Sequence, residues 1–119
     1  MKNLASPSVD FLFDAILSLN TREECYTFFE DICTVNEILS LSQRFEVAAM
    51  LRQKKTYLEI AEKTGASTAT ISRVNRSLIY GEGGYEVVFD RIQELPTDYS
   101  REIIETSATK KDDKKESGN

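Results

Sequence analysis

The side chains best suited to contact phosphates and base edges are concentrated between residues 52 and 76. This stretch holds six basic and two acidic residues, whereas residues 1–51 hold three and eight and residues 77–119 hold six and ten. The basic residues of the stretch are Arg52, Lys54, Lys55, Lys63, Arg73 and Arg76. A polyanion responds to charge within a Debye length of roughly 8–10 Å, so the overall charge of −5 does not exclude nucleic acid. The distribution predicts one basic surface between two acidic flanks.

The same stretch follows the pattern of two short helices joined by a tight turn. One helix is predicted from Tyr57 to about Lys63, and another from a Ser67 cap to about Tyr80. Helices that cross steeply need a small residue at the crossing and a turn residue that tolerates a positive φ, which Ala61 and Gly65 supply. The apolar residues expected to pack between the helices are Ile60, Ile71 and Val74. The pattern is that of a helix-turn-helix over residues 56–80.

Ten residues of this motif and its approach are predicted to contact DNA. Small and hydroxyl side chains at the start of a helix allow close approach to a groove, and arginines further along reach phosphate or guanine. The predicted contacts are Lys54, Lys55, Thr56 and Tyr57 around the first helix and Ser67, Thr68, Ala69, Ser72, Arg73 and Arg76 on the second. A helical hairpin with a solvated face would explain the buried residues equally well. It would not explain why acidic residues are absent between Thr64 and Tyr80.

Apolar spacing predicts further helices on both sides of the motif. Upstream, the expected helices cover residues 9–19, 21–33 with a Thr21–Glu24 capping box, 34–41 with a Thr34–Glu37 capping box, and 42–51 with Ser42 as its cap. The last of these is expected to bury Phe45, Ala48, Ala49 and Leu51. Downstream, a helix over residues 85–95, ended by Pro96, carries Val88, Phe89, Ile92 and Leu95 at spacings suited to burial.

Three segments are expected along the chain of 119 residues. Residues 1–7 are predicted to be a frayed N-terminus, and residues 8–95 a helical DNA-binding domain. Residues 96–119 are predicted to be a mostly disordered charged tail, because the sequence from Thr109 onward has no apolar side chain to bury.

Composition argues against several other classes of protein. The chain has no histidine, and no metal-ligand cluster, phosphate-binding loop or activated nucleophile is visible, so we expect no enzyme and no metal site. No apolar run approaches the roughly 18 residues of a membrane span, and no export signal is recognisable, so we expect a cytoplasmic protein without a membrane partner. Cys25 and Cys33 are expected to be buried free thiols.

The segment from Gly65 to Leu78, which reads GASTATISRVNRSL, resembles the recognition segment of the Trp repressor family. It is similar above all to the Trp-repressor-related branch of Gram-positive bacteria, and the resemblance extends over residues 8–95. It implies an all-α fold of about six helices and an intertwined homodimer in which the N-terminal helices of one chain wrap the other. Independent support for a dimer comes from more apolar surface than a short helical arm can bury alone, at Phe11, Phe13, Phe28, Phe29, Ile32, Ile38 and Leu39.

The resemblance also implies a site for a small effector. Thr70, Arg73 and Ser77 match the family at the positions that line the tryptophan site on the recognition helix. The family places an arginine that stacks on the indole where this chain has Gln43, with Arg44 adjacent and about 100° away around a helix. Leu41 also stands where the family has a glycine that opens space. We therefore expect no required cofactor, with tryptophan or a related corepressor as the alternative.

The sequence favours a transcriptional regulator, a repressor, that reads a near-palindromic operator in double-stranded DNA as a homodimer. The alternative is a helical protein-interaction module without specific DNA binding. Charge reversal at Arg73 and Arg76 distinguishes the two, because it would leave the partner binding of an interaction module intact.

Overall fold

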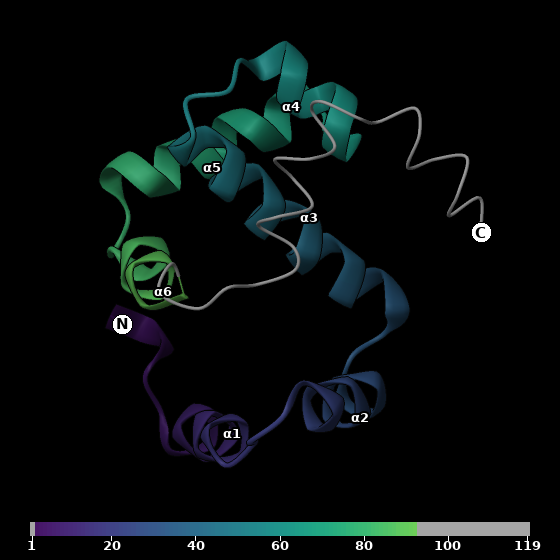
Figure 1. Ribbon diagram of the computed structural model, residues 1–119. Coiled ribbons are helices and arrows are strands. Elements are labelled where there is room, and N and C mark those ends of the chain that lie inside the picture. The colour runs from purple at the N-terminus through teal and green to yellow at the C-terminus, as the bar shows by residue number, and fades with distance from the viewer. Residues whose placement is uncertain (1, 93–119) are drawn as a thin grey trace, which may run out of the picture. The chain divides into compact units, whose positions relative to one another are not determined.

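Six α-helices follow one another in the computed structural model, which describes residues 2–92 (Figure 1). After a short 3₁₀ turn over Lys2–Leu4, the helices are α1 (Pro7–Leu17), α2 (Arg22–Ile32), α3 (Val35–Arg52), α4 (Tyr57–Thr64), α5 (Thr68–Tyr80) and α6 (Gly84–Ile92). No strand occurs among these residues, so the predicted all-α class is confirmed. Residues 93–119, which include the predicted tail, Leu95 and Pro96, lie outside the described residues.

Hydroxyl side chains fix where most of the helices begin. Ser6 caps α1 by accepting a hydrogen bond from the Val9 N–H (3.2 Å), so this helix starts at Pro7 rather than at residue 9. Thr21 caps α2 as predicted, although the Glu24 carboxylate accepts from the N–H of Asn20 and not from that of Thr21. At the N-terminus, the 3₁₀ turn over Lys2–Leu4 lies where the sequence predicts fraying.

The break predicted at Ser42 is wrong, because α3 runs without interruption from Val35 to Arg52. The Thr34–Glu37 capping box does open this helix, with hydrogen bonds of 2.8 and 3.1 Å. No glycine or proline follows before Arg52, and a serine exposed to solvent is tolerated inside a helix. Ser42 could cap a helix, but it lies inside α3 and does not start a new one.

The chain divides into two units, one over residues 1–46 and one from Val47 onward. The buried core lies in the second unit, where its members are Val47, Ala48, Met50, Ile60, Ala66, Ile71, Val74 and Phe89. Of the four residues predicted to be buried near the end of α3, only Ala48 is; Phe45, Ala49 and Leu51 are half-buried. In the first unit, neither α1 nor α2 has a buried residue.

Arg52 joins the end of α3 to α6. Its guanidinium lies 3.3 Å from the Glu86 carboxylate and 3.7 Å from that of Asp90, and it sits over the Phe89 ring at 4.9 Å from the centroid. Phe89 is buried as predicted, whereas Val88 remains 41% exposed. The ion pairs are largely solvated, so the packing of Phe89 contributes more to the attachment of α6.

Lys54, two residues beyond the end of α3, adopts a left-handed conformation, with φ +66°. The N–H of Lys55 donates to the Met50 carbonyl (3.1 Å) and that of Lys54 to the Leu51 carbonyl (3.0 Å), which is the Schellman arrangement. Glycine is the usual residue at such a position because a side chain there is strained. The link between α3 and α4 therefore retains a basic side chain at a cost in stability.

We predict that Lys54→Gly raises the free energy of unfolding by about 1 kcal/mol, because glycine adopts the left-handed conformation without steric strain. Urea unfolding followed by circular dichroism measures the change. The matched control is Gly65→Ala, since Gly65 has φ +75° and open space around the position of a Cβ. This control should lower the free energy by about the same amount. A Lys54→Gly variant no more stable than the parent would contradict the prediction.

Candidate nucleic-acid interface

A capping box fixes the start of α4. The Thr56 side chain accepts a hydrogen bond from the Glu59 N–H (3.1 Å), and the Glu59 carboxylate accepts one from the Thr56 N–H (2.8 Å). The hydrogen bond from the Thr56 N–H holds the pKa of the Glu59 carboxyl below its usual value of 4.5, and the positive charge of Lys55 acts in the same direction. Thr56 and Tyr57 are thereby fixed at the first turn of α4.

The turn between α4 and α5 satisfies its own backbone groups. Gly65 adopts φ +75°, as predicted, and its N–H donates to the Ala61 carbonyl (2.8 Å). The Thr64 hydroxyl donates to the Ile60 carbonyl (2.8 Å) and accepts from the Ala66 N–H (3.1 Å). The chain can therefore bury Ala66 in this turn without leaving these groups unpaired.

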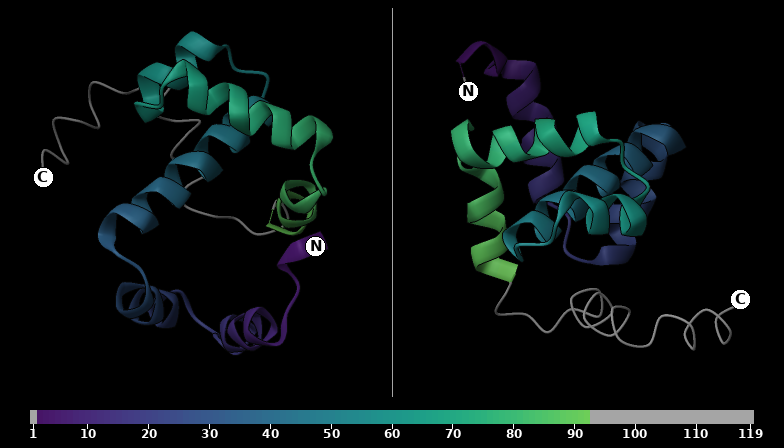
Figure 2. Two further views of the ribbon diagram at one scale, coloured as in Figure 1. Left: turned by 180° about the vertical axis from the view of Figure 1, so that it is seen from behind. Right: turned by 90° about the horizontal axis from the view of Figure 1, so that it is seen from above.

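The contact between α4 and α5 is apolar and closed to solvent. Ile60 of α4 and Ile71 and Val74 of α5 are each at most 1% exposed, which confirms the predicted core of the motif. The two helices pack against each other along this contact, as both views of Figure 2 allow the reader to follow. Burial of one such side chain contributes about 1.5–3 kcal/mol. Ala61, predicted at the crossing, is half-buried.

The outer face of α5 carries the predicted DNA contacts at the surface. The Ser67 hydroxyl caps the helix by accepting from the Thr70 N–H (3.1 Å), and no acidic residue lies in the first turn. The exposed residues are Ser67, Thr68, Ala69, Ser72, Arg73 and Arg76 on this side and Lys54, Thr56 and Tyr57 near α4. Lys55, also predicted, is half-buried. The helix N-terminus and the two arginines make this face attractive to phosphates.

Two residues modify the predicted surface. Arg52 belongs to the basic stretch of the sequence, but its guanidinium is paired with Glu86 and Asp90. Tyr80, which is not among the ten predicted contacts, is 81% exposed and lies four residues after Arg76, on the same side of α5. The spacing of four residues between Arg76 and Tyr80 was visible in the sequence and could have identified Tyr80 as part of the outer face. With Tyr80 included, the outer face extends to the last turn of α5.

The predicted effector residues lie in two places. Thr70, Arg73 and Ser77 share one side of α5 through their spacing of three and four residues. The Thr70 hydroxyl lies 3.2 Å from that of Ser67, within the cap of the helix. Gln43 and Arg44 lie on the part of α3 that belongs to the first unit, where Arg44 contacts the Ser40 hydroxyl at 3.5 Å.

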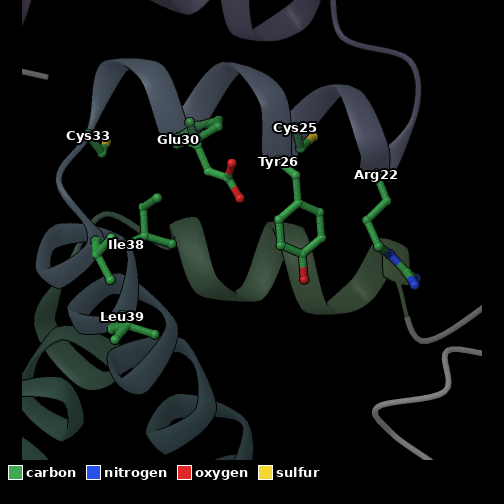
Figure 3. Close-up of a pocket in the computed structure, with 9 residues that line it drawn as sticks. Arg22, Cys25, Tyr26, Glu30, Cys33, Ile38 and Leu39 are labelled. Carbon is green, nitrogen blue, oxygen red and sulfur yellow. The ribbon is translucent and has the colours of Figure 1, made fainter.

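The first unit presents an apolar surface with two pockets. One, of about 600 Å³, is lined by α2 and the start of α3, including Tyr26, Phe29 and Leu39 (Figure 3). The other, of about 610 Å³, lies between α1, α2 and α3 and is bordered by Arg44. The large exposed apolar residues of this unit are Leu4, Phe11, Phe13, Leu17, Tyr26, Ile32, Val35, Leu39 and Leu41. We refer to these residues and the two pockets together as the N-terminal apolar face.

The predicted burial of the two cysteines is wrong for the single chain. Both thiols are free, but Cys25 is exposed and Cys33, which ends α2, is only half-buried. Both line the pocket of Figure 3, because α2 packs no side chain into a closed core. Among the described residues, no three His, Cys, Asp or Glu side chains are grouped to hold a metal ion. Nor do residues 2–92 contain a helix long and apolar enough to cross a bilayer.

Comparisons with known proteins agree with this architecture. The family model described as Trp repressor protein matches residues 7–93. An uncharacterised protein of Bacillus subtilis, YerC, is 57% identical over 97 residues, which cover 82% of this chain and 93% of the relative. The crystal structure of a TrpR-like protein from Eubacterium eligens superposes with a TM-score of 0.76 at 65% identity, covering 82% of this chain and all of the other.

A candidate Trp repressor from Staphylococcus aureus superposes with a TM-score of 0.75 at 56% identity, over 77% of this chain and 92% of the other. The family model, the sequence relative and the two structures all cover most of this chain, and the family model spans every helix of the motif around Gly65. The chain belongs to the Trp repressor family.

Proposed function

We propose that this protein is a sequence-specific DNA-binding regulator of transcription, a repressor, that acts in the cytoplasm on a near-palindromic operator. The observation that carries the proposal is the outer face of α5. It presents exposed hydroxyl and small side chains at its start and Arg73 and Arg76 beyond them, with no acidic residue from Lys63 to Gly81. Membership of the Trp repressor family supports the same function.

The geometry favours different roles for the two helices. The first turn of α5, with Ser67, Thr68 and Ala69, would lie at the base edges of the major groove, where short side chains permit close approach. Arg73 and Arg76 would reach guanine or phosphate. Lys54 and the first turn of α4 would contact the backbone beside the groove, because the capping box fixes that turn.

A homodimer would complete this function. Two copies of α5 placed about 34 Å apart enter successive major grooves on one side of the duplex. The N-terminal apolar face supports such a dimer, since exposed side chains such as Phe11 (78%) and Leu39 (60%) are costly to leave in water. A second copy of the chain that covers this face would also enclose Cys25 and Cys33.

We favour DNA binding that does not require tryptophan as a corepressor. Gln43 has no guanidinium to stack on an indole, and Arg44 lies beside the second pocket of the N-terminal apolar face. A titration of labelled duplex DNA with the protein should give the same affinity with and without millimolar L-tryptophan. Tighter binding with tryptophan would show that the protein is a corepressor-dependent member of its family.

We predict that the protein binds a duplex enriched from random sequences far more tightly than a shuffled duplex of the same composition. Arg76→Gln should weaken binding and reduce the slope of log affinity against log salt by about 0.9 for each phosphate that is no longer neutralised, or about twice that in a dimer. Fluorescence anisotropy between about 50 and 200 mM salt measures both quantities. Arg91→Gln, which changes an exposed arginine of α6, is the control and should leave them unchanged. Equal affinity for the two duplexes would refute the proposal.

We predict a particle of twice the 13.5 kDa chain mass in sedimentation equilibrium. Leu39→Glu should shift the particle towards the monomer, because a dimer that covers Leu39 would have to bury the new charge. The matched control is Leu58→Glu, since Leu58 is similarly exposed (69%) but lies on α4. A monomeric mass for the unmodified protein at every concentration, or equal effects of the two substitutions, would argue against this face as the interface.

We predict that Glu59→Gln weakens the dependence of stability on acid pH. The folded-state pKa of Glu59 is lowered, so its stabilising contribution is complete above about pH 4.5 and is lost as the pH falls through the folded-state pKa. The parent should therefore lose more stability than the variant between about pH 6 and pH 3 in thermal unfolding. Glu62→Gln, which leaves the capping box of α4 intact, is the control. Parallel curves for the parent and Glu59→Gln would contradict the prediction.

A further inference from the structure

Tyr80 is an aromatic residue whose side chain lies in solvent and does not pack into the core of the second unit. It is 81% exposed at the last position of α5, on the side opposite Ile71 and Val74. Within residues 2–92 its hydroxyl has no hydrogen-bond partner. A large exposed aromatic residue with an unused donor is suited to contact another molecule.

The helical register aligns Tyr80 with the predicted DNA contacts. Ala69, Arg73, Arg76 and Tyr80 are spaced by four, three and four residues, which places them in one row along α5. The row spans roughly 16 Å along the helix axis, whereas the major groove is about 12 Å wide. If Ala69 lies at the base edges, the other end of the row therefore lies over the sugar-phosphate backbone.

The end of α5 is also held in a defined position. The Gly81 N–H donates to the Ser77 carbonyl (2.9 Å), and a Cβ at Gly81 would overlap that carbonyl oxygen. Only glycine fits so close to the Ser77 carbonyl oxygen, and the hydrogen bond from Gly81 completes the last turn of α5 directly after Tyr80. The phenol is consequently carried by an ordered helical turn.

We infer that the Tyr80 hydroxyl donates a hydrogen bond to a backbone phosphate that flanks the bases read by the first turn of α5. The inference rests on the proposed DNA-binding function and adds a contact that is neutral in charge. A phenol can donate to phosphate oxygen, but it displaces no condensed counterion because it carries no charge. Tyr80 should thus contribute equally to affinity at every salt concentration and for every base sequence, whereas the contribution of Arg76 should fall as the salt concentration rises.

The test compares Tyr80→Phe with the parent on the enriched duplex and on the shuffled duplex. We expect binding about tenfold weaker on both, which corresponds to about 1.4 kcal/mol, with an unchanged slope of log affinity against log salt. Arg76→Gln measured alongside should reduce the slope. Arg91→Gln is the control, because Arg91 is also exposed but lies on α6, and the affinity of this variant should equal that of the parent.

Three results would overturn the inference. Equal affinity of Tyr80→Phe and the parent would show that the hydroxyl makes no phosphate contact. A reduction confined to the enriched duplex would make Tyr80 a base contact, and a reduction accompanied by a lower particle mass would make it a dimer contact. Failure of the proposed function is distinguishable from all three, because the parent itself would then show no preference between the duplexes.

Discussion

The closed apolar contact between α4 and α5 is the constraint on which the outer surface depends. α4 has 8 residues and α5 has 13, and helices this short are marginal in water when isolated. Burial of Ile60 on α4 and of Ile71 and Val74 on α5, where the two helices pack together, supplies the tertiary packing that keeps both helices formed. Because this contact fixes the rotation of α5, it also decides which side chains face outward, including Arg73 and Arg76.

The two parts of the chain differ in how much they stabilise themselves. The second unit holds the fully buried residues, whereas α1 and α2 have none and leave aromatic side chains such as Phe11 in solvent. The outer face of α5 therefore rests on a core that a single chain forms. In the proposed dimer, the N-terminal apolar face would instead set the distance between two such surfaces, so that shape and spacing are determined by different parts of the sequence.

Local interactions made much of this structure predictable. The capping boxes at Thr34 and Thr56 and the positive φ of Gly65 depend on residues within a few positions of each other, and all three were predicted correctly from the sequence. The core of the motif was predictable for the same reason, because Ile71 and Val74 are one turn apart. Features that depend on distant residues were not: the pairing of Arg52 with Glu86 joins positions 34 residues apart, and no local pattern signals it. Cys25 is exposed because α2 has no buried residue in the single chain. The apolar spacing of that helix predicts a buried face, and it gives no indication of whether the same chain supplies the partner for that face.

The two glycines that bound α5 restrict sequence variation in different ways. Gly65 is required for its backbone conformation, and a side chain there would meet open space, so asparagine, which tolerates this conformation better than most residues, is the least costly replacement. Gly81 is required for lack of room beside the Ser77 carbonyl, so no larger residue can replace it without moving the backbone. An insertion or deletion at either end of α5 would displace one of these glycines from the conformation or the space that requires it, so the length of the helix is constrained at both ends.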